Sequence, residues 1–179
     1  KMMEGLDIIL DRSRGLLDFV EKFRSLTPKG SLNRETFAVA DLFYRVKILM
    51  QGYAETERNA RMTSVVHPES MSLFADEKLV EQILINLLKN AREALDDPDH
   101  GVIAMKAFRN QDRKYIQIAD NGPGISQEAL ERIFIPFYTT KPQGSGIGLS
   151  LSRQIMRMHG GSITARNNPE DGVTFTLIF

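Results

Sequence analysis

Residues 102–119 read VIAMKAFRNQDRKYIQIA, with apolar and polar side chains alternating on both sides of a polar centre. This period of two is typical of β-strands that bury one face. Strands at 102–108 and 115–119, joined by a polar turn at 110–113, therefore predict a β-hairpin. Because a hairpin joins antiparallel strands, the chain departs from the regular strand–helix alternation of a parallel sheet.

The segments around the hairpin predict further strands and several helices. Strands are expected at 36–39, 63–67, 71–75, 162–165 and 173–179. Helices are expected at 41–57, 77–95, 127–133 and 147–158, the first two capped by Asp41 and Asp76 and the last ended by Gly160 and Gly161. Antiparallel strands with a few helices predict an α+β fold, a two-layer α/β sandwich whose mixed, mostly antiparallel sheet is covered by helices on one face.

The N-terminal part follows a different pattern. The a and d positions of a heptad repeat over residues 4–27 are mostly apolar: Leu6, Ile9, Ser13, Leu16, Val20 and Phe23. This repeat is typical of a long helix that packs against other helices. The stretch PKGS at 28–31 then breaks the helix as a linker. We therefore expect a helix with its linker at 1–30 and a globular domain at 31–179.

The composition is that of an ordinary globular protein. Of 179 residues, 42% are hydrophobic and 26% are charged. The 23 basic residues balance 23 acidic ones without a basic stripe, which disfavours a nucleic-acid surface. The lack of cysteine excludes disulfides and thiolate chemistry. With no cysteine, a cytoplasmic setting is the expectation for this region. No apolar run reaches bilayer length and no signal peptide is visible, and membrane anchoring of a parent protein is left open.

The helix expected at 77–95 carries polar side chains outside its apolar stripe. Asn86, Asn90 and Glu93 share one face, although asparagine is a poor choice for a helix interior. One interpretation is a solvated face. The other is a set of carbonyl oxygens for a hard cation such as Mg²⁺, which takes few protein ligands besides phosphate oxygens and water.

Two glycine-containing stretches have the same ambiguity. In DNGPGI at 120–125, Asp120 ends a strand, and Gly122 and Gly124 let backbone approach a flat ligand, although a simple turn also explains them. In FIPFYTTKPQGSGIGLS at 134–150, three alternate glycines lead into a helix whose N-terminus suits a phosphate. Their spacing fits neither a P-loop nor a dinucleotide-binding fingerprint.

Taken in order, four stretches carry a family resemblance. NLLKNAREAL at 86–95, DNGPGI, FIPFYTTK and GSGIGLSLSRQIMRMHGG resemble the N, first glycine, F and second glycine boxes of the GHKL ATPases. More narrowly, residues 35–179 resemble the catalytic and ATP-binding domain of bacterial sensor histidine kinases. The helix at 4–27 resembles the second helix of the hairpin that carries dimerisation and histidine phosphotransfer in that family.

The resemblance implies ATP and Mg²⁺ as ligands. Asn90 would coordinate Mg²⁺ and Asp120 would accept a hydrogen bond from the adenine amine. Lys141 would lie near the phosphates, and Asn90 and Lys141 are the residues assigned to catalysis. The whole implied nucleotide-binding set is Asn86, Asn90, Asp120, Gly122, Gly124, Ile125, Thr140, Lys141, Gly144, Ser145, Gly146, Ile147, Gly148, Leu149 and Thr174.

Two features depart from the common pattern of the family. Many of its kinases place a lysine or arginine three residues after the Mg²⁺ asparagine, where this chain has Glu93. Lys89 and Arg92 are the nearby cations that stay open as substitutes. The lid between Lys141 and Gly144 is also short, which implies a small, mobile cover.

The implied activity is transfer of the ATP γ-phosphate to a histidine and then to an aspartate of a response-regulator receiver domain. The implied assembly is a homodimer through the N-terminal helix. The family's acceptor histidine lies on a preceding helix, and His67, His100 and His159 suit structural or solvated roles instead. We therefore predict that this chain binds Mg·ATP and cannot phosphorylate itself at the usual site.

Two alternatives remain open. One is a GHKL ATPase of the topoisomerase or mismatch-repair type, which usually carries a glutamate base at the position of Asn86. The other is a non-catalytic nucleotide-binding dimerisation module, against which the presence of Asn90, Asp120 and all three glycines counts.

Overall fold

The computed structural model describes residues 32–52, 60–95, 100–141 and 144–179. The helix expected at 4–27 and its linker lie outside these ranges, as do Pro142 and Gln143 of the expected lid. Within the described ranges, no helix is both long enough and apolar enough to traverse a bilayer.

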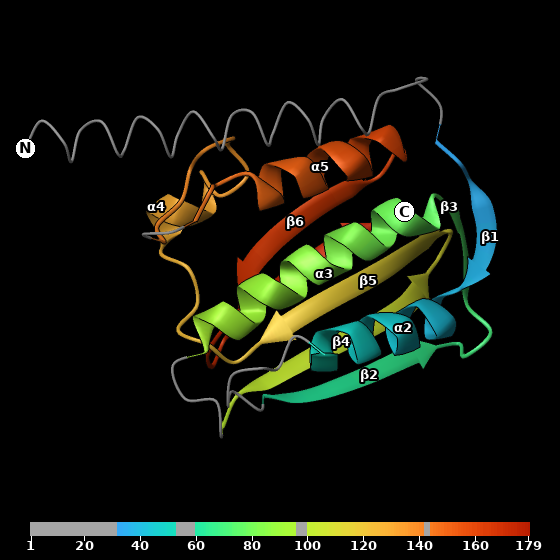
Figure 1. The fold of residues 1–179 in the computed structure, drawn as a ribbon, viewed down its shortest axis with the longest axis horizontal. Coiled ribbons are helices and arrows are strands. Elements are labelled where there is room, and N and C mark those ends of the chain that lie inside the picture. Colours follow the sequence, from blue (N-terminus) through green and yellow to red (C-terminus); the bar gives the residue numbers. More distant parts are fainter. Residues whose placement is uncertain (1–31, 53–59, 96–99, 142–143) are drawn as a thin grey trace, which may run out of the picture.

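The fold is built on a five-stranded sheet (Figure 1). Its strands lie in the order β2 (Arg61–His67), β4 (Val102–Asn110), β5 (Arg113–Asp120), β7 (Val173–Ile178) and β6 (Ser162–Asn167). Strand β2 pairs with β4 in parallel, and every other neighbouring pair is antiparallel. The mixed, mostly antiparallel sheet expected from the sequence is therefore confirmed.

The hairpin formed by β4 and β5 fixes the position of Asp120. Asn110 pairs with Arg113 across a turn of two residues, shorter than expected, in which Gln111 has φ 53°. Along both strands every second residue is buried: Ile103, Met105, Ala107, Ile116 and Ile118. Asp120 continues this series, so its side chain points to the buried face that the helices cover.

The first strand of the described domain belongs to a second, two-stranded sheet. It pairs β1 (Glu35–Ala38) with β3 (Ser72–Ala75), and helix α2 (Val39–Gly52) follows β1 directly. The expected cap at Asp41 is wrong, because the helix begins at Val39 and Asp41 lies in its first turn. The Val39 N–H donates to the Met71 carbonyl at 3.0 Å, so this end of the helix is satisfied without a side-chain cap.

Helix α3 (Glu77–Ala94) begins where the sequence predicts. The Asp76 carboxylate accepts a hydrogen bond from the Leu79 N–H at 3.2 Å, and its second oxygen accepts one from the Asn33 N–H at 3.0 Å. The buried side of the helix is apolar throughout: Val80, Ile83, Leu84, Leu87, Leu88 and Ala91.

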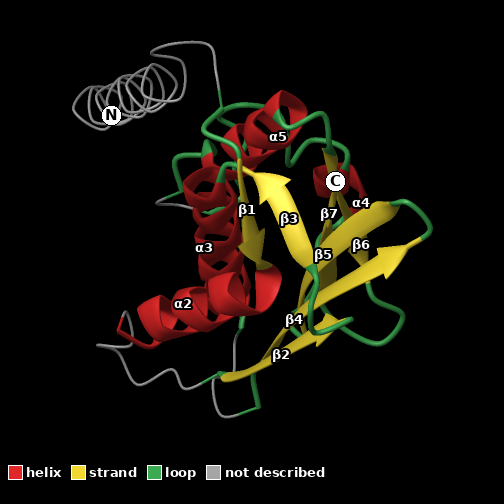
Figure 2. Ribbon diagram, turned by 90° about the vertical axis from the view of Figure 1, so that its right-hand side faces the viewer, coloured by secondary structure: helices red, strands yellow, loops and turns green. Residues whose placement is uncertain are grey.

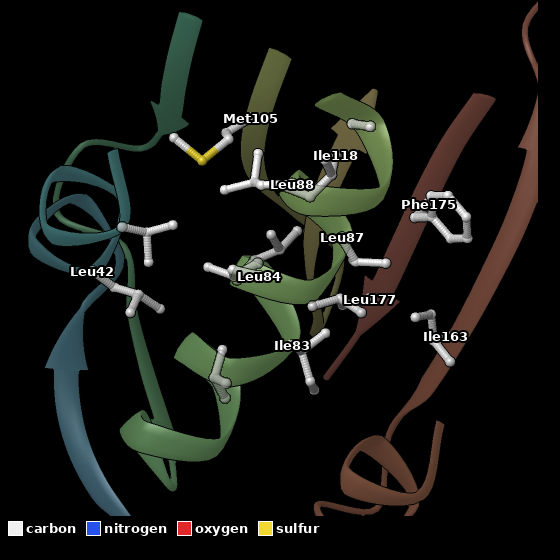
Figure 3. Packing of buried hydrophobic residues seen from close by; sticks show 14 of the residues in the cluster. Leu42, Ile83, Leu84, Leu87, Leu88, Met105, Ile118, Ile163, Phe175 and Leu177 are labelled. Atoms are coloured by element: carbon white, nitrogen blue, oxygen red, sulfur yellow. The ribbon is translucent and has the colours of Figure 1, made fainter. Parts of the chain in front are cut away.

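The helices form one layer over the sheet, as Figure 2 shows for α2, α3 and α5 (Gly148–Met158). Between the layers, Ile83, Leu84, Leu87 and Leu88 of α3 face Met105, Ile118, Phe175 and Leu177 of the sheet (Figure 3). This two-layer α/β sandwich is the fold expected. The short helix α4 (Gln127–Leu130) is capped by the Ser126 hydroxyl, and it ends before the expected residue 133.

Candidate functional site

One cavity of about 1300 Å³ lies between α3, the end of β5 and the segment that leads into α5. Thirteen of the fifteen residues assigned to nucleotide binding line it; Gly122 and Thr174 are the two that do not. The lining also includes Lys89, Glu93, Tyr138, Thr139 and Ser152. The four motifs, which together span residues 86–161, thus each contribute residues to one cavity.

Asn86 and Asn90 lie one turn apart on α3 and make different contacts. The Asn86 amide donates to the Ser152 hydroxyl at 3.1 Å, and this hydroxyl donates to the Gly148 carbonyl at 2.9 Å. These bonds tie α3 to the first turn of α5. The Asn90 side chain makes no hydrogen bond to any residue that the structure describes, although it lines the cavity. Its amide is therefore the one that a ligand can use.

Asp120 is the buried acidic group of the site, with 6% of its surface exposed. Its Oδ1 accepts hydrogen bonds from the Gly122 N–H at 3.0 Å and the Val173 N–H at 3.4 Å. Neither bond involves Oδ2, and no buried side-chain oxygen in the described residues lacks a partner, so Oδ2 keeps contact with the cavity. Burial raises the pKa of the carboxyl, while the two N–H donors and the charge of Lys141 oppose the shift.

The DNGPGI turn is held in place by two residues that were not among the predicted site residues: Asn167, the last residue of β6, and Asn168, which follows it. The Asn167 side chain accepts from the Ile125 N–H at 2.9 Å and donates to the Ile125 carbonyl at 2.6 Å. The Asn168 amide donates to the Asp120 carbonyl at 3.2 Å. The side chains of these asparagines make hydrogen bonds to backbone groups of the turn. From the sequence, Asn-Asn followed by Pro indicated only a turn.

Gly122 and Thr174 do not line the cavity but are neighbours of residues that do: Gly122 of Asp120, and Thr174 of Val173 and Phe175. A Cβ on Gly122 would lie 3.0 Å from the Ala94 carbonyl oxygen, so this glycine lets the turn approach the end of α3. The Thr174 hydroxyl donates to the Asn168 side-chain oxygen at 2.6 Å. Both residues thus contact the groups that hold Asp120 and the turn.

The three alternate glycines each permit a different close approach. A Cβ on Gly144 would lie 2.5 Å from the Thr139 hydroxyl oxygen. Gly146 has φ +67°, and a Cβ there would lie 2.5 Å from the Phe137 carbonyl carbon. A Cβ on Gly148 would overlap the Asn86 amide. The spacing therefore packs this segment against three neighbours, and it leaves the N-terminus of α5 without a side-chain cap at the cavity.

The expected phosphate-facing lysine has an acidic partner. The Lys141 Nζ lies 2.6 Å from Oε2 of Glu93, the residue that stands where the family pattern has a cation. Arg92, one of the substitutes considered, donates to the Met50 carbonyl at 3.2 Å and so holds α2 instead. Lys89 does line the cavity.

His159 is engaged through both ring nitrogens. Its Nε2 accepts from the Asp76 N–H at 3.0 Å, and its Nδ1 lies 2.8 Å from the Ile155 carbonyl oxygen. Burial lowers the pKa of the imidazole, and this neutral ring joins the end of α5 to the start of α3. A ring held in this way suits the structural role expected for His159.

The fold and the cavity agree with a family match. Residues 75–179 match the family described as histidine kinase-, DNA gyrase B-, and HSP90-like ATPase. Because the match covers more than half of the chain, this chain belongs to that ATPase family, and the GHKL resemblance is confirmed.

Individual relatives and structures point to the histidine kinases within the family. The signal transduction histidine-protein kinase AtoS of Escherichia coli is 33% identical over 178 residues, which cover 99% of this chain and 28% of AtoS. The solved catalytic domain of histidine kinase ThkA has a TM-score of 0.75 and 32% identity, covering 83% of this chain and 95% of that domain. ThkA in complex with the response regulator protein TrrA gives a TM-score of 0.76 at 27% identity, covering 100% of this chain and 51% of ThkA.

The chain corresponds to one part of longer relatives. It spans 18% of the sensor proteins DctB of Rhizobium meliloti and ChvG of Agrobacterium fabrum, and 35% of FixL of Bradyrhizobium diazoefficiens.

Proposed function

We propose that this chain is the ATP-binding catalytic region of a two-component sensor histidine kinase. Such a protein transfers the γ-phosphate of ATP to a histidine, which here lies outside this chain, and from there to an aspartate of a response regulator. One observation carries the proposal: Asp120, Asn90 and the uncapped N-terminus of α5 all border the same cavity.

In this proposal the Asp120 end of the cavity binds adenine. Oδ1 is held by two backbone N–H groups, which leaves Oδ2 as the acceptor for the exocyclic amine of the base. Gly124 and Ile125 border the same end. An acceptor fixed in this way discriminates between bases, because a base with a carbonyl at that position leaves the carboxylate unpaired.

The α5 end of the cavity binds the phosphates. The first N–H groups of an α-helix have no partner within the helix, and they and the helix dipole favour an anion. Gly144, Ser145 and Gly146 bring backbone to the same end. These residues orient the transferring group by backbone donors, which is the main protein contribution to phosphoryl transfer.

The residues present fit Mg²⁺. Among the residues that the structure describes, the Asn90 side-chain oxygen has no hydrogen-bond partner, and no three histidine or carboxylate side chains cluster as metal ligands. This donor set suits Mg²⁺, which is usually bound by one or two protein oxygens together with phosphates and water. When bound, the ion neutralises phosphate charge; Asn90 is the residue proposed to hold it.

The same cavity favours phosphotransfer over hydrolysis. Asn86 occupies the position where the related hydrolytic ATPases usually carry a glutamate base, and its amide is bonded to Ser152. The carboxylates among the lining residues are Asp120, held by backbone, and Glu93, paired with Lys141. No carboxylate described at this cavity is therefore placed as a base for water.

The wider assembly belongs to the same proposal. ThkA has been solved with the response regulator TrrA, which supports a receiver domain as the partner of this chain. We further propose that residues 1–30 form the dimerisation helix with its linker, that residues 31–179 form the catalytic domain, and that this region works in the cytoplasm, where ATP is available.

Equilibrium dialysis of the purified chain against ATP and GTP tests the proposal. Mg·ATP should bind and GTP should bind at least tenfold more weakly, because its base presents a carbonyl to Asp120. Equal binding of the two nucleotides, or no binding of ATP, would overturn it.

Self-labelling tests the missing acceptor. The chain incubated with γ-labelled ATP and Mg²⁺ should take up no label, because the acceptor histidine of the proposed kinase lies on a helix outside this chain. His159, at the end of α5, has both ring nitrogens engaged and offers no substitute. Acid-labile, alkali-stable label on the chain would contradict this expectation.

A further inference from the structure

An ion pair crosses the cavity from one wall to the other. Lys141, in the segment before the glycines, and Glu93, in the last turn of α3, are 48 residues apart in sequence and meet at 2.6 Å. Both line the cavity. The contact therefore links the two walls between which a nucleotide has to lie.

The pair also sets the local charge. Lys141 is near enough to Asp120 for its positive charge to lower the pKa of that carboxyl, against the larger effect of burial. One ammonium group thus lies within electrostatic reach of two carboxylates. A bound triphosphate would add several negative charges to the same space.

The pair is of a kind that exchanges partners readily. The side chains of Lys141 and Glu93 are 40% and 58% exposed, and exposed ion pairs contribute little to stability because water competes for both groups. A lysine ammonium has three rotatable donors on a flexible stem. A phosphate offers it charged acceptors, whose hydrogen bonds are among the stronger ones in proteins.

We propose that Glu93 is a positioning residue for phosphate binding: it holds Lys141 across the cavity in the nucleotide-free chain, and Lys141 moves from the Glu93 carboxylate to the phosphates when ATP binds. Glu93 therefore competes with ATP for one cation. This inference rests on the proposed function and assigns a role to the residue at which the chain departs from its family's pattern.

A double-mutant cycle with Glu93→Gln and Lys141→Gln tests the competition. Glu93→Gln should bind Mg·ATP about two- to fivefold more tightly, the fold-change expected from releasing an exposed ion pair. Lys141→Gln should bind Mg·ATP more weakly. In the Lys141→Gln background, Glu93→Gln should have no effect, because its influence acts through the lysine.

Adenosine binding shows whether the substitutions act on the phosphates or change the shape of the cavity. It carries the base without phosphates, so its affinity should be the same in all four proteins. Glu128→Gln is the matched control variant, since it removes the 3.5 Å pair between Glu128, on α4, and Arg132, which follows that helix, and Glu128 does not line the cavity. This variant should bind ATP as the unmutated chain does.

Three results would overturn the inference while leaving the proposed function intact. The first is weaker or unchanged ATP binding by Glu93→Gln. The second is that Glu93→Gln increases ATP affinity as much in the Lys141→Gln background as it does alone. The third is that adenosine affinity changes together with ATP affinity. The equal gain would mean that Glu93 repels phosphate directly. Failure of the unmutated chain to bind ATP would overturn the proposed function itself. Melting temperatures within about two degrees of each other establish that all four proteins are folded.

Discussion

The two ends of the cavity are built in opposite ways. At one end Asp120 is buried at the end of a sheet strand, and two backbone N–H groups fix one of its oxygens. At the other end Lys141 is partly exposed, and one exposed ion pair holds it. The first group has one orientation available to it, whereas the second can change its partner.

In the proposed function, the fixed end of the cavity would select the base and the exchangeable end would bind and release the phosphates. A fixed acceptor selects a ligand because a wrong group leaves it unpaired, and it needs no rearrangement when the right group arrives. An exchangeable cation binds a charged group without holding it permanently. The contrast predicts large effects for changes at the fixed end and smaller, charge-dependent effects at the exchangeable end.

Asp120→Asn should have the largest effect. The two N–H donors would keep the amide oxygen at the Oδ1 position, so the amide NH₂ would face the adenine amine and two donors would meet. Losing a charged hydrogen bond and leaving a donor unpaired costs about 4 kcal/mol, or about a thousandfold in ATP affinity. A fluorescent nucleotide titration measures this loss.

The same variant is expected to remain folded. Burial raises the pKa of the Asp120 carboxyl above 3.8, so the folded chain binds a proton there more tightly than the unfolded chain does. The stability that this proton contributes is complete below about pH 3.8 and is lost as the pH rises through the raised pKa. At about pH 7 the nucleotide-free variant should therefore melt no lower than the unmutated chain. Unchanged ATP affinity in a folded Asp120→Asn chain would refute the base-binding assignment.

Gly146→Ala should have the next largest effect, on stability. A Cβ there meets Phe137 backbone at 2.5 Å, and the residue has φ +67°. The strain and the contact together are expected to cost about 2–3 kcal/mol. Gly160→Ala is the matched control, because Gly160 has φ +77° and open space around its Cβ position, so only the strain of about 1 kcal/mol remains. Urea unfolding compares the two, and equal losses would contradict the packing role of Gly146.

Asn90→Ala should reduce Mg·ATP affinity about tenfold and remove its dependence on Mg²⁺. Asn90 has no other partner among the described residues, so the free chain should lose little stability. Titration of ATP with and without Mg²⁺ measures the difference. A variant that still requires Mg²⁺ would place the ion elsewhere.

The smallest effect expected is a pH dependence of stability from His159. Burial lowers the pKa of its imidazole below 6.5, with Arg34 adding to the shift and the Ile155 carbonyl and Asp76 opposing it. The unfolded chain then binds a proton that the folded chain excludes. The contribution of His159 is complete above about pH 6.5, and the free energy of unfolding should fall as the pH decreases below that value. His159→Gln should reduce this slope in urea unfolding, and an identical slope would refute the assignment.

The sequence predicted the sheet, helix α3 and most of the residues that line the cavity. The alternation of apolar and polar residues along 102–119 predicts which side chains are buried, and the same alternation places Asp120 on the face that the helices cover. Asp76 was recognisable as a cap because its side chain acts on its own helix. These predictions depend on neighbours in sequence, which local patterns describe well.

The contacts between distant segments were not predictable in the same way. A glycine signals that a Cβ is missing, but the sequence did not indicate that Gly146 meets Phe137 or that Gly148 meets Asn86. Glu93 was recognised as a departure from the family pattern, without its partner Lys141. Asn167 and Asn168 had the composition of any turn. Each of these contacts depends on which segments the fold brings together.

Hydrogen bonds around Asp76 connect the start of the described domain to helices α3 and α5. The Asn33 N–H and the Leu79 N–H share its carboxylate, and its own N–H reaches His159. The Arg34 guanidinium donates to the Met158 carbonyl at 3.3 Å. The chain that arrives from the N-terminal side is thus fastened to the first turn of α3 and the last turn of α5. Residues 33 and 34 are therefore bonded directly to the ends of the two helices that border the cavity.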